Sequence, residues 1–124
     1  MSQDLESYRW KNRIILLVAP EIDNNGLESQ LTEFNAKKTE MDDRVIKLFL
    51  VTPKSTYRTN MEAATLSASK VYTALNIDID FAGIILIGKD GGVKLKESFT
   101  IKVKDIFNLI DSMPMRRQEM KNKG

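Results

Sequence analysis

The chain has 124 residues, a length typical of a single domain, and it contains neither cysteine nor histidine. Thiol nucleophiles, CxxC redox pairs, Cys/His zinc sites and Ser-His-Asp triads are therefore excluded. Its 19 basic and 17 acidic residues give a formal net charge of +2, a balance too even to indicate nucleic acid as a partner. The composition, 42% hydrophobic and 29% charged, is that of an ordinary soluble domain.

The apolar runs predict neither a membrane span nor a signal peptide. The longest run, from Ile14 to Pro20, is far shorter than the roughly 20 residues that cross a bilayer as a helix. The residues from Met1 to Ser7 are polar and acidic, so they lack the apolar region of a signal peptide.

The first half of the chain predicts two buried strands joined by a helix. The run from Arg13 to Pro20 is rich in branched apolar residues, which indicates a strand buried on both faces. Apolar residues recur at i, i+4 and i+7 from Leu27 to Phe34, which predicts a helix over 26–38. A second strand is predicted over 45–51, and Trp10 is expected to pack in the core.

The second half predicts a helix, a β-hairpin and a last helix. The Asp90-Gly91 pair between two apolar runs is a strong signal for a hairpin turn. The expected elements are a loop over 52–60, a helix over 61–75, strands over 81–88 and 93–96, a helix over 102–112 that Pro114 ends, and a flexible basic tail over 116–124.

These elements predict a single α/β domain over residues 1–124, in the order β-α-β-α-β-β-α. Strands joined through helices favour parallel pairing, whereas the hairpin adds antiparallel strands. This order resembles that of the thioredoxin fold, so the expected architecture is thioredoxin-like, with a central mixed sheet, a C-terminal β-hairpin and a closing helix.

Three strings of residues narrow the resemblance. They are Arg9-Trp10-Lys11-Asn12-Arg13 before the first strand, Gly88-Lys89-Asp90-Gly91-Gly92-Val93-Lys94 after the third, and Ile110-Asp111-Ser112-Met113-Pro114-Met115-Arg116 near the end. Together they resemble the DUDES domain family, a thioredoxin-like domain of unknown function, in its bacterial single-domain form. Relatives of this family occur in matrix proteins of the Equarin and sushi-repeat type.

The resemblance implies a thioredoxin-like domain that has lost its redox site. The turn from Pro20 to Asn25, where an active thioredoxin has its CxxC pair, contains no sulfur. Asp80 and Phe81 stand where an active thioredoxin has a proline before the third strand. Thiol–disulfide exchange and peroxidase chemistry are therefore excluded, and we expect a binding or structural module rather than an enzyme.

The resemblance also implies a setting outside the cytoplasm. Bacterial relatives begin with a secretion signal, and Ser2-Gln3-Asp4-Leu5 resembles a mature start. We therefore expect a periplasmic or secreted protein that interacts with another protein, while a cytoplasmic setting stays open.

The emptied redox corner is the first candidate site. Thioredoxin-like folds meet their partners at the carboxyl ends of the strands, where an exposed edge or a partner loop can bind. The alternative is a retired surface loop. The residues concerned are Glu21, Ile22, Asp23, Asp80 and Phe81.

Basic residues near the two ends of the chain form the second candidate site. Arginine pairs bidentately with sulfate, phosphate and carboxylate, so a polyanion or glycosaminoglycan could bind. The alternative is structural, with the arginines paired to carboxylates or to carbonyls at helix ends. The residues concerned are Arg9, Lys11, Arg13, Arg116 and Arg117.

No metal and no cofactor are expected. The acidic groups Glu40, Asp42 and Asp43 and the pair Asp78 and Asp80 lack the ligand spacing of an EF-hand. The segment from Gly83 to Asp90 fits the spacing of a phosphate loop, but its residues form a strand core followed by a hairpin instead of a helix. An enzyme built on carboxylates and lysines alone is the third and last function considered.

Overall fold

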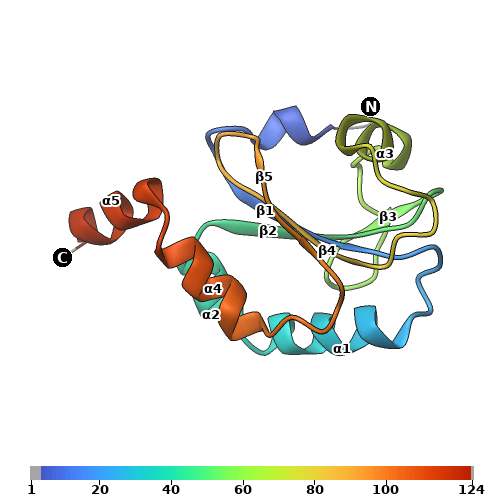
Figure 1. Cartoon of the computed structure of the whole chain (residues 1–124), viewed down its shortest axis with the longest axis horizontal. Helices are drawn as coiled ribbons and strands as arrows, with labels where there is room; N and C mark the ends of the chain where they lie inside the picture. Colours follow the sequence, from blue (N-terminus) through green and yellow to red (C-terminus); the bar gives the residue numbers. More distant parts are fainter. Residues whose placement is uncertain (1–3, 124) are drawn as a thin grey trace.

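The computed structural model describes residues 4–123 (Figure 1). The expected mature start at Ser2 therefore lies outside the described residues. In chain order the elements are the 3-10 helix η1 (Leu5–Tyr8), β1 (Arg13–Val18), α1 (Asn25–Asn35), α2 (Lys38–Asp43), β2 (Ile46–Val51), β3 (Thr56–Tyr57), α3 (Ala68–Leu75), β4 (Gly83–Ile87), β5 (Val93–Glu97), α4 (Val103–Asp111) and α5 (Pro114–Lys123).

One mixed sheet of five strands organises the chain, in the order β3-β2-β1-β4-β5. β1 lies at its centre, parallel to β2 and antiparallel to β4, and β5 and β3 add antiparallel strands at the two edges. The predicted thioredoxin-like α/β architecture with a C-terminal hairpin and helix is confirmed.

Helices cover both faces of the sheet, with α1, α2 and α4 on one side and η1 and α3 on the other (Figure 1). Alternate residues of each central strand face opposite sides, so two apolar clusters form. Ile15 and Leu17 of β1 pack into the cluster that contains Phe34 of α1, and Ile14 and Leu16 pack into the cluster that contains Val71 of α3. The expectation of a first strand buried on both faces is correct.

The hairpin forms where the Asp90-Gly91 pair predicts it. Gly88 donates its N–H to the Gly92 carbonyl at 2.9 Å, and Asp90 Oδ1 accepts the Gly92 N–H at 2.9 Å. Gly91 has a φ of 86°, a backbone conformation that is energetically unfavourable for a residue with a side chain.

The segment after β2 differs from the expectation of a loop followed by a long helix. Thr56 and Tyr57 form β3, and α3 begins only at Ala68, after Ser67 accepts the Lys70 N–H as its N-cap. Met61 has a φ of 70°, which is incompatible with a helix at that position. The predicted helix over 61–75 is therefore too long at its start.

The acidic residues Glu40, Asp42 and Asp43 lie in a short helix. Residues Lys38–Asp43 form α2 because Met41 gives this turn an apolar anchor that is 7% exposed. The predicted helix over 26–38 consequently ends earlier, at Asn35, and the chain continues as a second short helix.

Two further expectations differ at the ends of the chain. The segment expected as a flexible tail is helical from Pro114 to Lys123, since proline suits the first position of a helix and Arg116 within it is 2% exposed. Trp10, expected in the core, is 61% exposed with a φ of 68°, and Tyr8 packs instead against Phe49, with ring centroids 5.6 Å apart. Within residues 4–123, no helix is both long and apolar enough to cross a bilayer.

Gly83, the first residue of β4, has no room for a side chain, and this gives a test of the sheet. A Cβ there would lie 2.2 Å from the carbonyl oxygen of Glu97 on β5. Because that obstacle is backbone, we expect Gly83→Ala to lower the free energy of unfolding by roughly 1–3 kcal/mol in urea denaturation. The control is Gly92→Ala, in which the atom nearest the new Cβ is the movable Asp90 Oδ1 at 3.3 Å, so a smaller loss of stability is expected. An equal loss of stability in both variants would contradict the prediction.

Candidate functional site

The candidate site is a corner where three strand ends meet. β1 and β2 are parallel, so Val18 and Val51 end side by side, and the antiparallel β4 begins at Gly83 directly opposite Val18. The chain leaves or enters the sheet here in three connections, over 19–24, 52–55 and 76–82. Carboxyl ends of strands are the usual position for ligand sites in open α/β sheets.

A hollow of about 440 Å³ lies between these connections. Its wall is part apolar and part charged, with the exposed Ile79 beside the carboxylates and one lysine. The residues that line it are Pro20, Glu21, Ile22, Thr52, Pro53, Lys54, Tyr57, Ile79 and Asp80.

Local hydrogen bonds hold each connection in shape. Asn24 caps α1 by accepting the Leu27 N–H at 3.0 Å, which fixes the end of the first turn. Thr52 donates its N–H to the Ser55 carbonyl at 2.8 Å, closing the second turn. In the third, Asp78 Oδ1 accepts the Asp80 N–H at 3.1 Å, and Ile79 between them is 63% exposed.

The corner brings together three of the five residues that the sequence assigns to it. Glu21, Ile22 and Asp80 line the hollow, whereas Asp23 and Phe81 do not. Phe81 packs against the apolar cluster on the α3 side of the sheet, where the Lys96 ammonium lies 4.9 Å from its ring. Whether these residues bind a partner stays a prediction.

Two parts of the hollow were not predicted from the sequence. They are the residues of the second connection, over 52–55, and the exposed Ile79 of the third connection. Pro53 and Lys54 follow a strand parallel to the first, so the rule that carboxyl ends meet could have placed them here. For Ile79 no comparable signal exists, because an isoleucine in a short connection is normally a core residue.

Few ionisable side chains line the corner hollow. Among the side chains that line the hollow, the charged groups are Glu21, Asp80 and Lys54, and the Thr52 hydroxyl is held in its own turn by Ser55. Within residues 4–123, no three Asp or Glu residues are grouped so that they could hold a metal ion.

Two of the basic residues assigned to the second candidate site, Arg13 and Arg116, belong to a buried ion-pair network. The two terminal guanidinium nitrogens of Arg13 donate to Glu119, at 3.1 and 3.0 Å, and Lys89 donates to the same carboxylate at 2.7 Å. Arg13 also donates to the Arg44 carbonyl at 2.9 Å. The side chain of Arg13 is 2% exposed, so its charge is almost fully removed from water.

The second half of the network is built around Arg116. It donates to Asp111 Oδ1 at 3.0 Å and to both the carbonyl and the carboxylate of Asp43. Arg44 donates two hydrogen bonds to the Asp111 carboxylate, at 3.1 and 2.8 Å. Its guanidinium also lies 4.6 Å from the centroid of the Phe107 ring. This is the structural alternative considered for the arginines, in which they satisfy carboxylates and the carbonyls at a helix end.

The network lowers the pKa of its carboxylates. Partial burial by itself raises the pKa of Glu119, but hydrogen bonds from Arg13 and Lys89 outweigh it and hold the value below the ordinary 4.5. Burial likewise raises the pKa of Asp111, and hydrogen bonds from Arg44 and Arg116 hold it below 3.8.

This geometry restricts the polyanion prediction. Arg13 and Arg116 are buried and paired, so their donors point into the protein. Arg9, Lys11 and Arg117 are the exposed members of the predicted set, and Arg9 shares its charge with Glu6 at 3.1 Å.

The network also joins the three strings that carry the family resemblance. Arg13 of the first string and Lys89 of the second share Glu119, and the third string supplies Asp111 and Arg116. Trp10 donates its backbone N–H to the Lys89 carbonyl at 2.6 Å, and the Asn12 side-chain amide donates to the Val45 carbonyl at 3.4 Å. These strings are therefore one structural unit at the end of the sheet opposite the corner.

Comparison with protein families gives a match over nearly the whole chain. The model of the family described as "Domain of unknown function (DUF4174)" matches residues 4–119. A curated relative, Coiled-coil domain-containing protein 80 of Danio rerio, is 26% identical over 134 residues. The match covers 94% of this chain and 15% of that protein, so the chain corresponds to a small part of it.

Comparison with solved structures confirms the fold. A reduced 2-Cys peroxiredoxin of Plasmodium vivax superposes with a TM-score of 0.67 at 17% identity, over 92% of this chain and 84% of that one. A mitochondrial 2-Cys peroxiredoxin of Plasmodium falciparum gives 0.57 at 21% identity, over 87% and 79%. Both are thioredoxin-like, and at such identities the likeness concerns the fold alone.

The lowered pKa values make the network a source of pH-dependent stability. A depressed carboxyl pKa contributes stability above its ordinary value, and that contribution is lost as the pH falls through the lowered value. We expect the free energy of unfolding to begin falling near pH 4.5 and to keep falling below 3.8, the ordinary values of the two groups. In Glu119→Gln this acid dependence should be weaker, and stability at pH 7 should drop by roughly 3 kcal/mol because Arg13 keeps its buried charge.

The matched control is Glu6→Gln, which breaks the exposed pair with Arg9 and should change stability by less than about 1 kcal/mol. Chemical denaturation from pH 3 to pH 7 measures both effects. An equally steep acid dependence in Glu119→Gln and the unsubstituted chain would show that this network does not control acid stability.

Proposed function

Because the chain belongs to the DUF4174 family, a domain of unknown function, and has no thiol for peroxiredoxin chemistry, we propose that it is a non-redox binding module. In this proposal the corner hollow contacts a segment of another protein. The same position on the scaffold would carry a cysteine pair in an active thioredoxin, and here it offers only contact surface and charge.

The corner hollow is the observation that supports this function. Ile79 is 63% exposed and lines the hollow together with Ile22 and Tyr57, so the hollow offers a partner a contiguous apolar surface. Beside it stand the carboxylates of Glu21 and Asp80, opposed by the single cation of Lys54. The chemistry fits a partner segment that has an apolar side chain next to a lysine or arginine.

A setting outside the cytoplasm belongs to the same proposal. Its support is the resemblance of the strings at Arg9–Arg13, Gly88–Lys94 and Ile110–Arg116 to a domain found in matrix proteins. Fractionation of cells that express the full gene, with an antibody against this domain, tests it directly. Recovery in the cytoplasmic fraction alone would remove this part of the proposal.

The corner proposal predicts that charge reversal abolishes partner binding. Glu21→Lys combined with Asp80→Lys should reduce the amount of captured partner at least roughly tenfold, because like charges would face the partner's cation. The measurement is quantitative mass spectrometry of proteins retained by immobilised chain from an extract of the source organism. Circular dichroism and thermal unfolding verify that the variant is folded.

The matched control reverses two exposed carboxylates away from the corner, with Glu33→Lys and Glu40→Lys on α1 and α2. This control should retain the partner at the level of the unsubstituted chain. Equal retention by the corner variant, or loss in the control as well, would place the contact elsewhere.

Exposure of Trp10 favours a second candidate function, the binding of a polyanion. Trp10 is 61% exposed in a left-handed conformation, with the Arg9 guanidinium 5.5 Å from its ring and the exposed Lys11 next in the chain. An aromatic face beside two cations suits a sulfated or carboxylated sugar, since the ring packs on the sugar and the cations pair with its anions.

Heparin chromatography tests this second function. If the Arg9–Lys11 surface binds polyanions, the chain should elute above about 0.15 M salt, and Arg9→Ala with Lys11→Ala should elute earlier. Lys54→Ala at the corner removes one charge elsewhere and serves as the control. Elution of the unsubstituted chain below physiological salt would exclude the polyanion function.

A further inference from the structure

One edge of the sheet is only partly covered. β3 pairs with the last two residues of β2, Leu50 with Tyr57 and Val51 with Thr56. After Tyr57 the chain turns away, since Arg58 donates its N–H to the Glu62 carbonyl at 2.8 Å. On the side of β2 away from β1, therefore, no strand among the described residues pairs with the stretch from Ile46 to Phe49.

The backbone of this stretch presents hydrogen-bonding groups outward. Arg13 donates its N–H to the Val45 carbonyl and Ala19 to the Val51 carbonyl, both at 3.0 Å, so odd-numbered residues of β2 face β1. Successive residues of a strand point their backbone groups to opposite sides, so the N–H and C=O groups of Ile46 and Leu48 point away from β1. Across residues 4–123, no loop or helix supplies a backbone hydrogen bond to these two residues.

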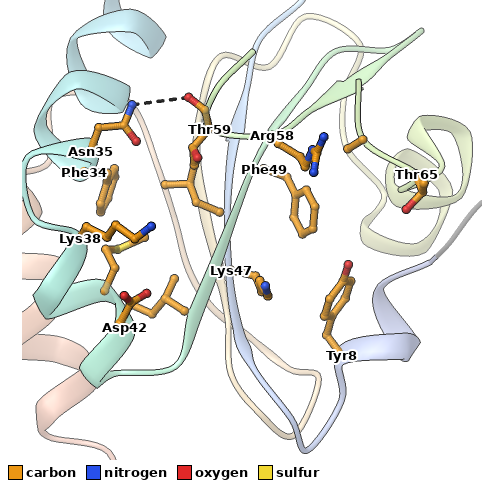
Figure 2. Close-up of a pocket in the computed structure, with 14 residues that line it drawn as sticks. Tyr8, Phe34, Asn35, Lys38, Asp42, Lys47, Phe49, Arg58, Thr59 and Thr65 are labelled. Carbon is orange, nitrogen blue, oxygen red and sulfur yellow. Dashed lines mark hydrogen bonds between the residues drawn. The ribbon is translucent and has the colours of Figure 1, made fainter. Parts of the chain in front are cut away.

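A groove of about 310 Å³ runs along this edge (Figure 2). One wall is formed by α1 and α2, with Phe34 and Lys38, and the other by Tyr8 and Phe49. A hydrogen bond of 3.5 Å from Asn35 to the Thr59 carbonyl crosses the groove, drawn as the dashed line in Figure 2. The groove shares no lining residue with the corner hollow.

The charges beside the groove are mainly positive. Lys38 lies on the helical wall and Lys47 on β2 itself, and both are exposed. Neither lysine forms an ion pair with any other residue from 4 to 123. Asp42 is the one carboxylate among the lining residues, and Arg58 at the far end is paired with Glu62.

We propose that this groove binds an extended acidic peptide segment of a partner protein, which adds to β2 in line with β3. Ile46 and Leu48 then exchange backbone hydrogen bonds with alternate residues of the segment, and its carboxylates meet Lys38 and Lys47. Main-chain pairing supplies affinity in such strand addition, whereas side chains supply specificity. A lysine on an open edge repels a basic strand, and it disfavours a neutral strand because its charge would be desolvated without a partner. An acidic strand is therefore the favoured occupant.

The probe is a fluorescent peptide of about eight residues that alternates valine and glutamate, titrated against the chain by fluorescence anisotropy. A peptide of the same length that alternates valine and lysine should bind at least roughly tenfold more weakly. Two versions carry N-methyl groups on alternate amides, in the two possible registers. Strand addition requires that one register abolishes binding and the other leaves it nearly unchanged, because only alternate amides face β2.

Variants then locate the peptide on the chain. Lys38→Glu with Lys47→Glu should weaken binding at least roughly tenfold. The control is Lys96→Glu on β5, the other edge of the sheet, which should leave the affinity unchanged. Amide hydrogen exchange supplies an independent readout. Bound peptide should slow exchange of the backbone amides of Ile46 and Leu48. It should not change exchange at Lys47 and Phe49, whose amides already point toward β1.

Several results would overturn the proposal. Equal binding of the acidic and basic peptides removes its charge basis, and insensitivity to both N-methyl registers removes strand addition. A loss of affinity in Lys96→Glu moves the peptide to the β5 edge. No binding of the acidic peptide by folded, unsubstituted chain refutes it outright. These outcomes leave the corner function untouched, because Glu21 and Asp80 play no part in them.

Discussion

Arg13 begins the central strand with a side chain that is 2% exposed, and a guanidinium so far removed from water is stable only when it is paired. Glu119, 106 residues further along the chain, provides the bidentate carboxylate. That contact places α5 near the start of β1, and Lys89 on the same carboxylate brings the hairpin to this place as well. A single buried charge thus fixes how the first strand, the hairpin and the last helix fit together.

The same pairing determines which surfaces are left for function. Two of the arginines that a polyanion would need, Arg13 and Arg116, have their donors turned inward. The end of the sheet that contains the network is therefore a stabilising end. The opposite end carries the corner hollow, whose three connections are held mainly by local turns and the Asn24 cap and leave Ile79 exposed. Separation of this kind allows the corner to change its side chains with little effect on the fold.

Much of the fold could be predicted because its signals are local in the sequence. The run from Arg13 to Pro20 and the Asp90-Gly91 pair each specify their element through a few neighbouring residues. The elements that the sequence did not predict depend on tertiary contacts. α2 forms because Met41 is buried, and α5 is held in place because Glu119 pairs with Arg13 at the start of β1. The prediction that Trp10 is buried was wrong for the same reason, since Tyr8 packs beside Phe49 instead. At the candidate site, the meeting of Glu21 with Asp80 follows from strand order, whereas the exposure of Ile79 follows from no pattern.

The two open surfaces differ in charge, and this difference limits what one partner can do. The corner has two carboxylates against one lysine, whereas the β2 groove has two unpaired lysines against one carboxylate. A basic segment that suits Glu21 and Asp80 is repelled by Lys38 and Lys47, and an acidic strand that suits the groove is repelled at the corner. The two surfaces share no lining residue, so under these proposals each segment docks while the other site is occupied. Taken together, the two proposals describe a domain that holds two segments of opposite charge and thereby connects proteins.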